Sequence, residues 1–356
     1  MASDVDDSVA VGVIGAGFIA QVAHLPALAS IAGCRIAALA DNRLELLDQV
    51  AKRYAIPRRF NDYREMLASP DIDAVLVVMP RRAQSAVTRD VLGKGLPALT
   101  EKPMAYTSAV ANELVQLAKA NDVTLAVGYP RAYDCGVGLF RTLLESEKAE
   151  GELGELLHVR VADFCGAYTV PMPPHTRGTK PRPFRYSEDP AAPMFLEPKL
   201  HQAYDYTINV MSHDLNLVRS LFGDPLEAIT FRVRPGGVQH AVLAAAAVDV
   251  ELSVGPASLG VWDQRIDVYF RKGCLSLVLD SSLARQSCGV VVRRHSGGEE
   301  ERLMPPIAKR KFAFDLQAEA FIESVRCGVP FCPDGEMAAK DIATIENLWR
   351  IASVAS

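Results

Sequence analysis

The chain has 356 residues, of which 49% are hydrophobic and 23% are charged, so we expect a soluble globular protein with enough core for two domains. Its net charge of −5 and its lack of a basic block argue against nucleic acid or an anionic membrane as a partner. Residues 1–8 do not resemble a signal peptide, and no apolar run reaches the roughly 20 residues of a membrane span, so a cytoplasmic protein is expected.

The first part of the chain alternates strand-like and helix-like segments. Short apolar runs predict strands at Val9–Ile14, Arg35–Ala40, Ala74–Met79, Ala98–Thr100 and Thr124–Val127. Between them we expect helices at Phe18–Ile31, Arg43–Tyr54, Ser85–Leu92 and Ser108–Ala120. The alternation predicts an α/β domain with a doubly wound parallel sheet, a Rossmann fold, over residues 1–130. Ligands of such sheets bind at the carboxyl ends of the strands.

The turn after the first expected strand, Gly15 to Ala20, fits the dinucleotide fingerprint Gly-x-Gly-x-x-Ala. Gly15 permits the tight turn, Gly17 lets a pyrophosphate approach the backbone, and Ala20 lets the helix pack closely on the strand. The helix that begins here offers free N–H groups and a positive dipole end to the phosphate. A glycine-rich turn that binds nothing is the alternative, and the flanking strand and helix favour the cofactor. The predicted cofactor contacts here are Gly15, Gly17, Phe18 and Ile19.

The second expected strand ends in Asp41, which lies 24 residues after Gly17 (41 − 17 = 24). This is near the spacing of about 20 residues at which a carboxylate binds the ribose hydroxyls of NAD and repels a 2′-phosphate. Arg43 follows closely and could instead accommodate that phosphate. Because the acidic group stands at the strand end, we predict NAD rather than NADP.

From about Leu156 onwards the pattern changes to longer strand-like segments. They are Leu156–Asp163, Ala228–Val233, Val242–Val254 and Asp267–Phe270, with helices expected at Val210–Leu221, Phe314–Val325 and Ala338–Ser353. We therefore expect a second, α+β domain over residues 131–356, built on a large, mainly antiparallel sheet. Residues 168–203 are expected to form a lid-like loop. Such a sheet would leave an apolar face needing cover, so a homo-oligomer, a dimer or tetramer, is expected.

The segment Thr100-Glu101-Lys102-Pro103 closes the fourth expected strand. Lys102 would lie where the nicotinamide binds, and Pro103 fixes the backbone there. A lysine in that place can bond a substrate hydroxyl and help to move its proton, and desolvation or a neighbouring cation can lower its pKa. A solvated surface lysine is the alternative, and composition alone does not separate the two.

Together with the fingerprint, Glu101-Lys102-Pro103 makes the chain resemble the glucose–fructose oxidoreductase, inositol dehydrogenase and MocA (Gfo/Idh/MocA) family. The resemblance runs along nearly the whole chain, in segments that occur in the family's order. They are Val77-Val78-Met79-Pro80, which resembles the segment that places a proline beside the cofactor, Gly128 to Asp134, Leu153 to Val159, and Pro333-Asp334-Gly335-Glu336. The resemblance implies an oxidoreductase for sugars or cyclitols and adds Pro80 and Glu101 to the cofactor site.

The family's remaining catalytic segment falls at Asn209 to Leu215. Members usually carry Asp and then His four residues later, on one face of a helix. His213 matches the histidine, but Asn209 stands where the aspartate is usual, and an amide cannot take a proton. Acid–base work is therefore expected from His213 and Lys102, with Asn209 positioning a hydroxyl. Gln84, where members often have His, is given no chemical role.

Five further residues are candidates for substrate contacts. Arg131 and Tyr133 could bind substrate or serve as an ion-pair and a core residue, and Lys199, His201 and Tyr204 could line the pocket or belong to a solvated loop. Seven cysteines without a Cys-x-x-Cys pair predict neither a disulfide framework nor a metal site. The expected activity is an NAD-dependent hydride transfer at a secondary alcohol or ketone of a sugar, amino-sugar, sugar nucleotide or cyclitol. The alternatives are a dinucleotide-binding regulatory protein, and an NAD-assisted glycosidase or epimerase without net redox.

Overall fold

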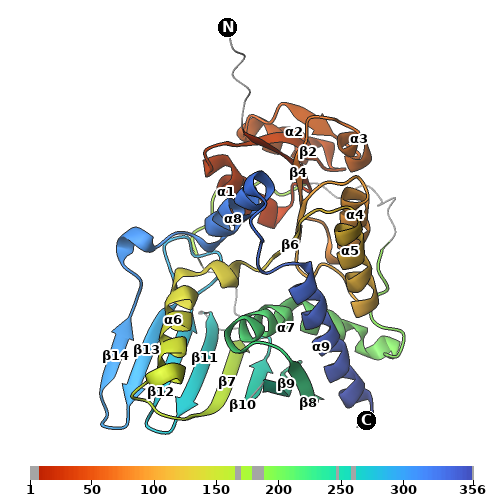
Figure 1. The fold of residues 1–356 in the computed structure, drawn as a ribbon. Helices are drawn as coiled ribbons and strands as arrows, with labels where there is room; N and C mark the ends of the chain where they lie inside the picture. Colours follow the sequence, from red (N-terminus) through yellow and green to blue (C-terminus); the bar gives the residue numbers. More distant parts are fainter. Residues whose placement is uncertain (1–7, 165–169, 179–187, 246–247, 258–261, 355–356) are drawn as a thin grey trace. The chain divides into compact units, whose positions relative to one another are not determined.

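The structure, a computed structural model, describes residues 8–164, 170–178, 188–245, 248–257 and 262–354. The chain forms two compact units, and neither is one continuous segment (Figure 1). Unit 1 contains Met1–Gly128, Met172–Pro190 and Phe314–Ala339, and unit 2 contains Tyr129–Pro171, Ala191–Ala313 and Lys340–Ser356. The lid-like loop expected at 168–203 includes residues 168–169 and 179–187, which lie outside the described residues.

Unit 1 is built on a six-stranded sheet in the order β3-β2-β1-β4-β5-β6, and all its pairings are parallel. This confirms the predicted doubly wound sheet. The sequence did not predict the short edge strand β3, because three half-exposed polar and aromatic residues give no apolar run. The strands are β1 Val9–Ile14, β2 Cys34–Ala40, β3 Arg58–Phe60, β4 Ala74–Val77, β5 Ala98–Glu101 and β6 Leu125–Gly128.

The helices of unit 1 follow the strands in alternation. The helix expected at Phe18–Ile31 contains a π-helical turn, η1 Ala20–His24, before it continues as α1 Leu25–Ser30. A short helix before β4, α3, was not predicted, since five residues are too few for a helical period. The others are α2 Leu44–Arg53, α3 Tyr63–Leu67, α4 Arg81–Leu92, α5 Ser108–Ala120 and α8 Ala313–Cys327.

Unit 2 is built on an eight-stranded sheet in the order β14-β13-β12-β11-β7-β10-β9-β8. Among these pairings β10 with β7 is parallel and the rest are antiparallel, which confirms the predicted mainly antiparallel sheet. The strands are β7 Leu156–Phe164, β8 Leu226–Val233, β9 Gln239–Ala245, β10 Val248–Val254, β11 Asp263–Phe270, β12 Gly273–Leu279, β13 Val290–His295 and β14 Glu300–Leu303.

The prediction of one strand over Val242–Val254 was wrong. The chain there makes the antiparallel pair β9 and β10, in which Ala245 lies opposite Val248. No glycine or proline marks the reversal, and small apolar residues run through it, so the sequence pattern shows no break. Strand β13 and the edge strand β14 were not predicted, because their charged residues hide the alternation.

Three long helices accompany this sheet. They are α6 Cys135–Glu150, α7 His201–Phe222 and α9 Gly335–Val354, whose residues from Lys340 onwards belong to unit 2. Helix α6 was not predicted; the Asp134 carboxylate caps it by accepting the N–H of Gly136 at 2.8 Å. Helix α7 begins at His201 rather than Val210, so one helix carries His201, Tyr204, Asn209 and His213.

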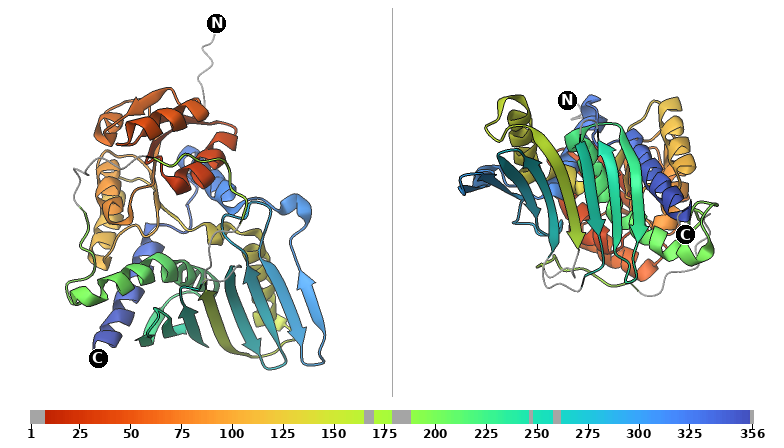
Figure 2. Two further views of the ribbon diagram at one scale, coloured as in Figure 1. Left: turned by 180° about the vertical axis from the view of Figure 1, so that it is seen from behind. Right: turned by 90° about the horizontal axis from the view of Figure 1, so that it is seen from below.

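The helices of unit 2 leave one face of its sheet uncovered (Figure 2). That face is not uniformly apolar, contrary to the expectation. Glu251, Arg160 and Asp267 stand side by side on β10, β7 and β11, so opposite charges alternate across the strands. The opposite face carries the apolar core, with Val250, Val159 and Val268 fully buried in the neighbouring register positions.

Candidate active site

The turn between β1 and η1 requires glycine at its first position. Gly15 has φ +98°, and its N–H donates to the Ala40 carbonyl at 2.8 Å. A Cβ on Gly15 would lie 2.0 Å from the Val78 carbonyl oxygen, which no side chain could tolerate. The turn is therefore held between the ends of β2 and β4, at the point where the strand order of the sheet reverses.

The second glycine of the turn borders open space. A Cβ on Gly17 would meet a single neighbour, the Arg43 guanidinium, at 3.9 Å. Its backbone is thus accessible to a phosphate group, and the helical segment that starts beside it supplies N–H groups. Phe18 is 40% exposed at this edge, while Ala20 is fully buried against the sheet, as predicted for the fingerprint.

The Asp41 carboxylate is already saturated with donors. Its Oδ2 accepts the N–H of Ala16 at 2.8 Å and Nη2 of Arg43 at 2.7 Å. Its Oδ1 accepts the backbone N–H and Nε of Arg43 at 2.9 and 2.8 Å. The hydrogen bond to Asp41 raises the pKa of Arg43 above its usual value. A ribose hydroxyl that bonds Asp41 must therefore share or displace the arginine.

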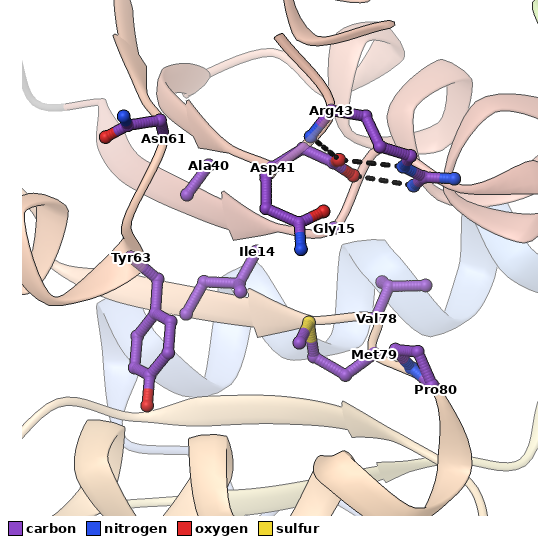
Figure 3. A pocket seen from close by; sticks show the side chains of 11 residues that line it. Ile14, Gly15, Ala40, Asp41, Arg43, Asn61, Tyr63, Val78, Met79 and Pro80 are labelled. Atoms are coloured by element: carbon purple, nitrogen blue, oxygen red, sulfur yellow. Dashed lines mark hydrogen bonds and ion pairs between the residues drawn. The ribbon is translucent and has the colours of Figure 1, made fainter. Parts of the chain in front are cut away.

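A pocket opens next to this pair at the carboxyl ends of β1, β2 and β4 (Figure 3). Asp41 and Arg43 lie on one side, and Tyr63 and Pro80 lie at opposite ends in this view. Asn61 and Tyr63, which sequence reasoning missed, lie directly after β3 and at the start of α3, the two short elements without a sequence signal. The lining residues are Ile14, Gly15, Ala40, Asp41, Asn42, Arg43, Asn61, Tyr63, Val78, Met79 and Pro80.

Gln84 joins the ends of two strands in this region. It is 1% exposed, and its Oε1 accepts the N–H of Met79 at 2.7 Å. Its Nε2 donates to the Val77 carbonyl at 2.7 Å and to Oγ1 of Thr100 at 2.6 Å. Gln84 therefore fixes both the Val78–Pro80 wall of the pocket and the start of the Thr100–Lys102 segment, which is a positioning role.

Lys102 follows β5 directly and is half-buried. Its N–H donates to Oε2 of Glu101 at 3.2 Å. The other carboxylate oxygen, Oε1, lies 2.6 Å from Nε2 of His24, a buried residue of η1. Glu101 thereby links the helix that follows the fingerprint to the backbone of Lys102. His24 was not singled out from the sequence, because its partner lies far away in the chain.

His213 belongs to unit 2 and lies on α7, one helical turn after Asn209, so the two side chains share a face. The Tyr129 ring stands edge-on to the His213 ring, with centroids 5.9 Å apart and an interplanar angle of 86°. Both His213 and Asn209 are half-buried, whereas Tyr129 is fully buried. Tyr129 is a further neighbour of the predicted catalytic helix that sequence reasoning missed.

The five predicted substrate residues occupy different surroundings in unit 2. Arg131 is buried and donates to the Asp280 carbonyl at 2.6 Å. Tyr204 is fully buried. Lys199 is exposed and pairs with Glu197 at 2.7 Å. The remaining two, Tyr133 and His201, are half-buried.

Asp214 of α7 has a buried carboxylate that bonds Gln264 of β11, a strand of the unit 2 sheet. It is 1% exposed, and its Oδ1 accepts Nε2 of Gln264 at 2.8 Å. Burial raises the pKa of Asp214 well above its usual value, and the charge of Asp163 raises it further; Gln264 and Arg131 act in the opposite direction. Since Asp163 is also a hydrogen-bond neighbour, a proton between the two carboxyls satisfies both.

Asp214→Asn should therefore stabilise the protein at neutral pH. An unfolded aspartate ionises near pH 4, whereas the folded Asp214 keeps its proton to higher pH, so the wild type loses stability as pH rises. We expect Asp214→Asn to exceed the wild type by about 1–3 kcal/mol at pH 8 and to match it near pH 4. Urea unfolding at both pH values measures this. Asp214→Ala, which leaves Gln264 without its acceptor, should be destabilising throughout; equal pH profiles for wild type and Asp214→Asn would contradict the shared proton.

No group of three or more His, Cys, Asp or Glu residues suited to a metal ion occurs among the described residues. The cysteines within the described ranges are free thiols. Within the same ranges, none of the helices has the length and apolar character needed to cross a membrane.

Comparisons with known proteins show which proteins this chain resembles. Residues 9–129 match the family of oxidoreductases with an NAD-binding Rossmann fold, Gfo/Idh/MocA. An inositol 2-dehydrogenase from Burkholderia cenocepacia is 25% identical over 344 residues, covering 92% of this chain and 90% of that protein.

Two solved structures share the fold along nearly the whole chain. One is a 3-ketoreductase from Actinomadura kijaniata in complex with TDP-benzene and NADP, with a TM-score of 0.76, 17% identity and coverage of 97% and 98% of the two chains. The other is an oxidoreductase from Agrobacterium radiobacter in complex with NAD+, L-tartaric acid and magnesium, with a TM-score of 0.73, 18% identity and coverage of 98% and 97%. Residues 9–129 of unit 1 therefore carry the NAD-binding Rossmann fold of the Gfo/Idh/MocA oxidoreductase family.

Proposed function

We propose that this protein transfers a hydride between NAD and a secondary alcohol or ketone of a sugar, amino-sugar, sugar nucleotide or cyclitol. One observation carries the proposal: unit 1 combines a glycine turn that excludes side chains, a carboxylate at the end of β2 and a lysine at the end of β5. All three stand at the edge of the sheet where ligands bind. The substrate class rests on the relatives, which include an inositol 2-dehydrogenase and a 3-ketoreductase.

The residues of unit 1 fit a dinucleotide. Gly15 and Gly17 leave backbone N–H groups open to a pyrophosphate, and Asp41 offers acceptors for ribose hydroxyls. Pro80 lines the same pocket, and Glu101 stands beside Lys102 at the next strand end. When bound, the nicotinamide supplies the redox chemistry, and the protein contributes orientation and proton transfer.

Proton transfer is assigned to two side chains. In this proposal Nζ of Lys102 bonds the reacting oxygen of the substrate, and the imidazole of His213 accepts or returns its proton. Histidine titrates near neutral pH, which suits a relay that must run in both directions. Asn209 shares a helix face with His213 and orients a neighbouring hydroxyl, because its amide can donate and accept but cannot ionise.

Lys102→Ala tests this assignment. The variant should lose activity by about 10²- to 10⁴-fold in kcat because it removes a proton-transfer group, while NAD affinity stays close to wild type. Activity is measured as NADH formation with a panel of sugars and cyclitols, and affinity by NADH fluorescence. Lys119→Ala is the matched control, since Lys119 makes a surface ion pair with Glu336 on unit 1. A kcat near that of the wild type would remove Lys102 from the mechanism.

The same assays separate this proposal from the two alternative functions, a regulatory protein and a glycosidase or epimerase. A wild-type protein that binds NADH but reduces or oxidises no member of the panel would favour a regulatory role. Cofactor that remains bound through purification, with product formed and no free NADH, would favour a glycosidase or epimerase.

Asp41 should set the preference for NAD. Asp41→Ser removes the negative charge that repels a 2′-phosphate and releases Arg43 to bind it. We expect the wild type to favour NAD in kcat/KM by about tenfold or more, and the variant to lose or reverse that preference. Asp48→Ser on the following helix, α2, removes a surface ion pair with Arg59 of β3; it serves as the control and should keep the preference for NAD. A wild type that prefers NADP would overturn this interpretation.

We also propose that the protein is a homo-oligomer, a dimer or tetramer. The support is the uncovered face of the unit 2 sheet, where a two-fold axis between the neighbouring residues Glu251 and Arg160 would place each opposite the other in a second copy. Light scattering coupled to size exclusion should give two or four chain masses. Charge reversal by Arg160→Glu should shift the equilibrium towards single chains, and a monomeric wild type at micromolar concentration would refute assembly.

A further inference from the structure

Residues 172–178 come from the middle of the chain, yet they belong to unit 1 and lie against the helix that follows the glycine turn. Gln21 makes this connection and is fully buried. Its Nε2 donates to the Thr176 carbonyl at 3.0 Å, and its Oε1 accepts the Thr176 N–H at 2.8 Å. The same Nε2 donates to the Ala16 carbonyl at 2.9 Å. One side-chain amide therefore binds both the turn and the 172–178 segment.

Arg53, near the end of α2, makes a second attachment. Its Nη1 donates to the Pro174 carbonyl at 2.9 Å and to Oε1 of Gln21 at 3.2 Å. Its Nη2 donates to Oγ1 of Thr176 at 3.1 Å. Three neutral oxygens from two parts of the chain thus share one guanidinium, and such charge-assisted bonds are stronger than neutral ones.

The 172–178 segment lies beside both the glycine turn and the Asp41–Arg43 pair of the proposed cofactor site. At one end the His175 ring stands edge-on to Phe18, with centroids 5.1 Å apart. At the other end, a Cβ on Gly178 would lie 3.2 Å from Cδ of Arg43, the residue that covers Asp41. Glycine at 178 therefore allows the backbone to pass close to Arg43, whose guanidinium also borders Gly17.

We propose that residues 172–178 form the outer wall of the dinucleotide site, with Gln21 and Arg53 as its positioning residues, and that this wall slows cofactor release. The inference rests on the proposed function, because it assumes that a dinucleotide pyrophosphate binds at the Ala16–Gly17 turn. A wall on this side shields the pyrophosphate from water, and a bound dinucleotide must loosen it to leave. Loss of the Arg53 guanidinium removes two bonds to this wall and one to Gln21, and none of the three involves the glycine turn itself.

Arg53→Ala and Thr176→Val test the wall. The first removes both Arg53 bonds to the segment, and the second removes one of them; both variants keep the bonds between Gln21 and the Thr176 backbone. The NADH dissociation rate, followed by stopped-flow fluorescence, should rise roughly tenfold in Arg53→Ala and less in Thr176→Val. Arg59→Ala, which breaks a surface ion pair with Asp48, is the matched control and should release NADH at the wild-type rate.

A second readout does not depend on turnover. Arg177 is exposed, so trypsin cleavage after it, followed by mass spectrometry, reports how firmly the segment is held. We expect faster cleavage in Arg53→Ala without cofactor, and protection of the wild type by NADH. An Arg53→Ala variant with wild-type cleavage and wild-type NADH release would overturn the wall alone. A protein that binds no NADH would overturn the proposed function, and the wall with it.

Discussion

The contact between the Gly15 backbone and the Val78 carbonyl is the constraint on which unit 1 depends. With no room for a Cβ, the chain leaves β1 in a conformation that only glycine adopts readily, and it enters the next helix directly behind the strand end. That reversal places the first N–H groups of the helix at the sheet edge where β2 and β4 also end. A carboxylate on β2 and a proline after β4 then lie beside the turn because of the strand order.

Polar side chains from distant parts of the chain hold this edge of the sheet in place. Gln84 joins the ends of β4 and β5, Glu101 joins His24 to the Lys102 backbone, and Gln21 joins the turn to Thr176. In each case a buried or half-buried side chain bonds backbone groups outside the sheet ladder. These hydrogen bonds hold the backbone of the site in position. The side chains that would touch a ligand can therefore exchange their own hydrogen bonds with the ligand.

The sequence predicted what local patterns encode and missed what distant partners create. Gly15, Gly17 and Asp41 follow from spacing along one strand-turn-helix unit, and both sheets follow from periodicity. The β9–β10 pair was missed because its reversal carries no turn residue, and α6 because two glycines in its first turn lower the helical signal. Gln84, His24 and Gln21 could not be assigned, since their partners lie between 5 and 155 residues away. The contact between Tyr129 and His213 was missed for the same reason, because the two residues lie far apart in the sequence.

Two buried aspartates of this chain have different hydrogen-bond partners and therefore different chemical properties. Asp41 accepts four N–H bonds, three of them from Arg43. Asp214 accepts one amide N–H and faces a second carboxyl, and burial raises its pKa well above the usual value, which disfavours the charged form. Asp214 also lies five residues after Asn209, which turns it to a different face of α7, so it does not replace the aspartate that Asn209 lacks. In the mechanism that we propose, the acid–base role on this helix therefore falls to His213, and a protein with Asn209 in place of a carboxylate should depend more strongly on Lys102 as its second proton-transfer group.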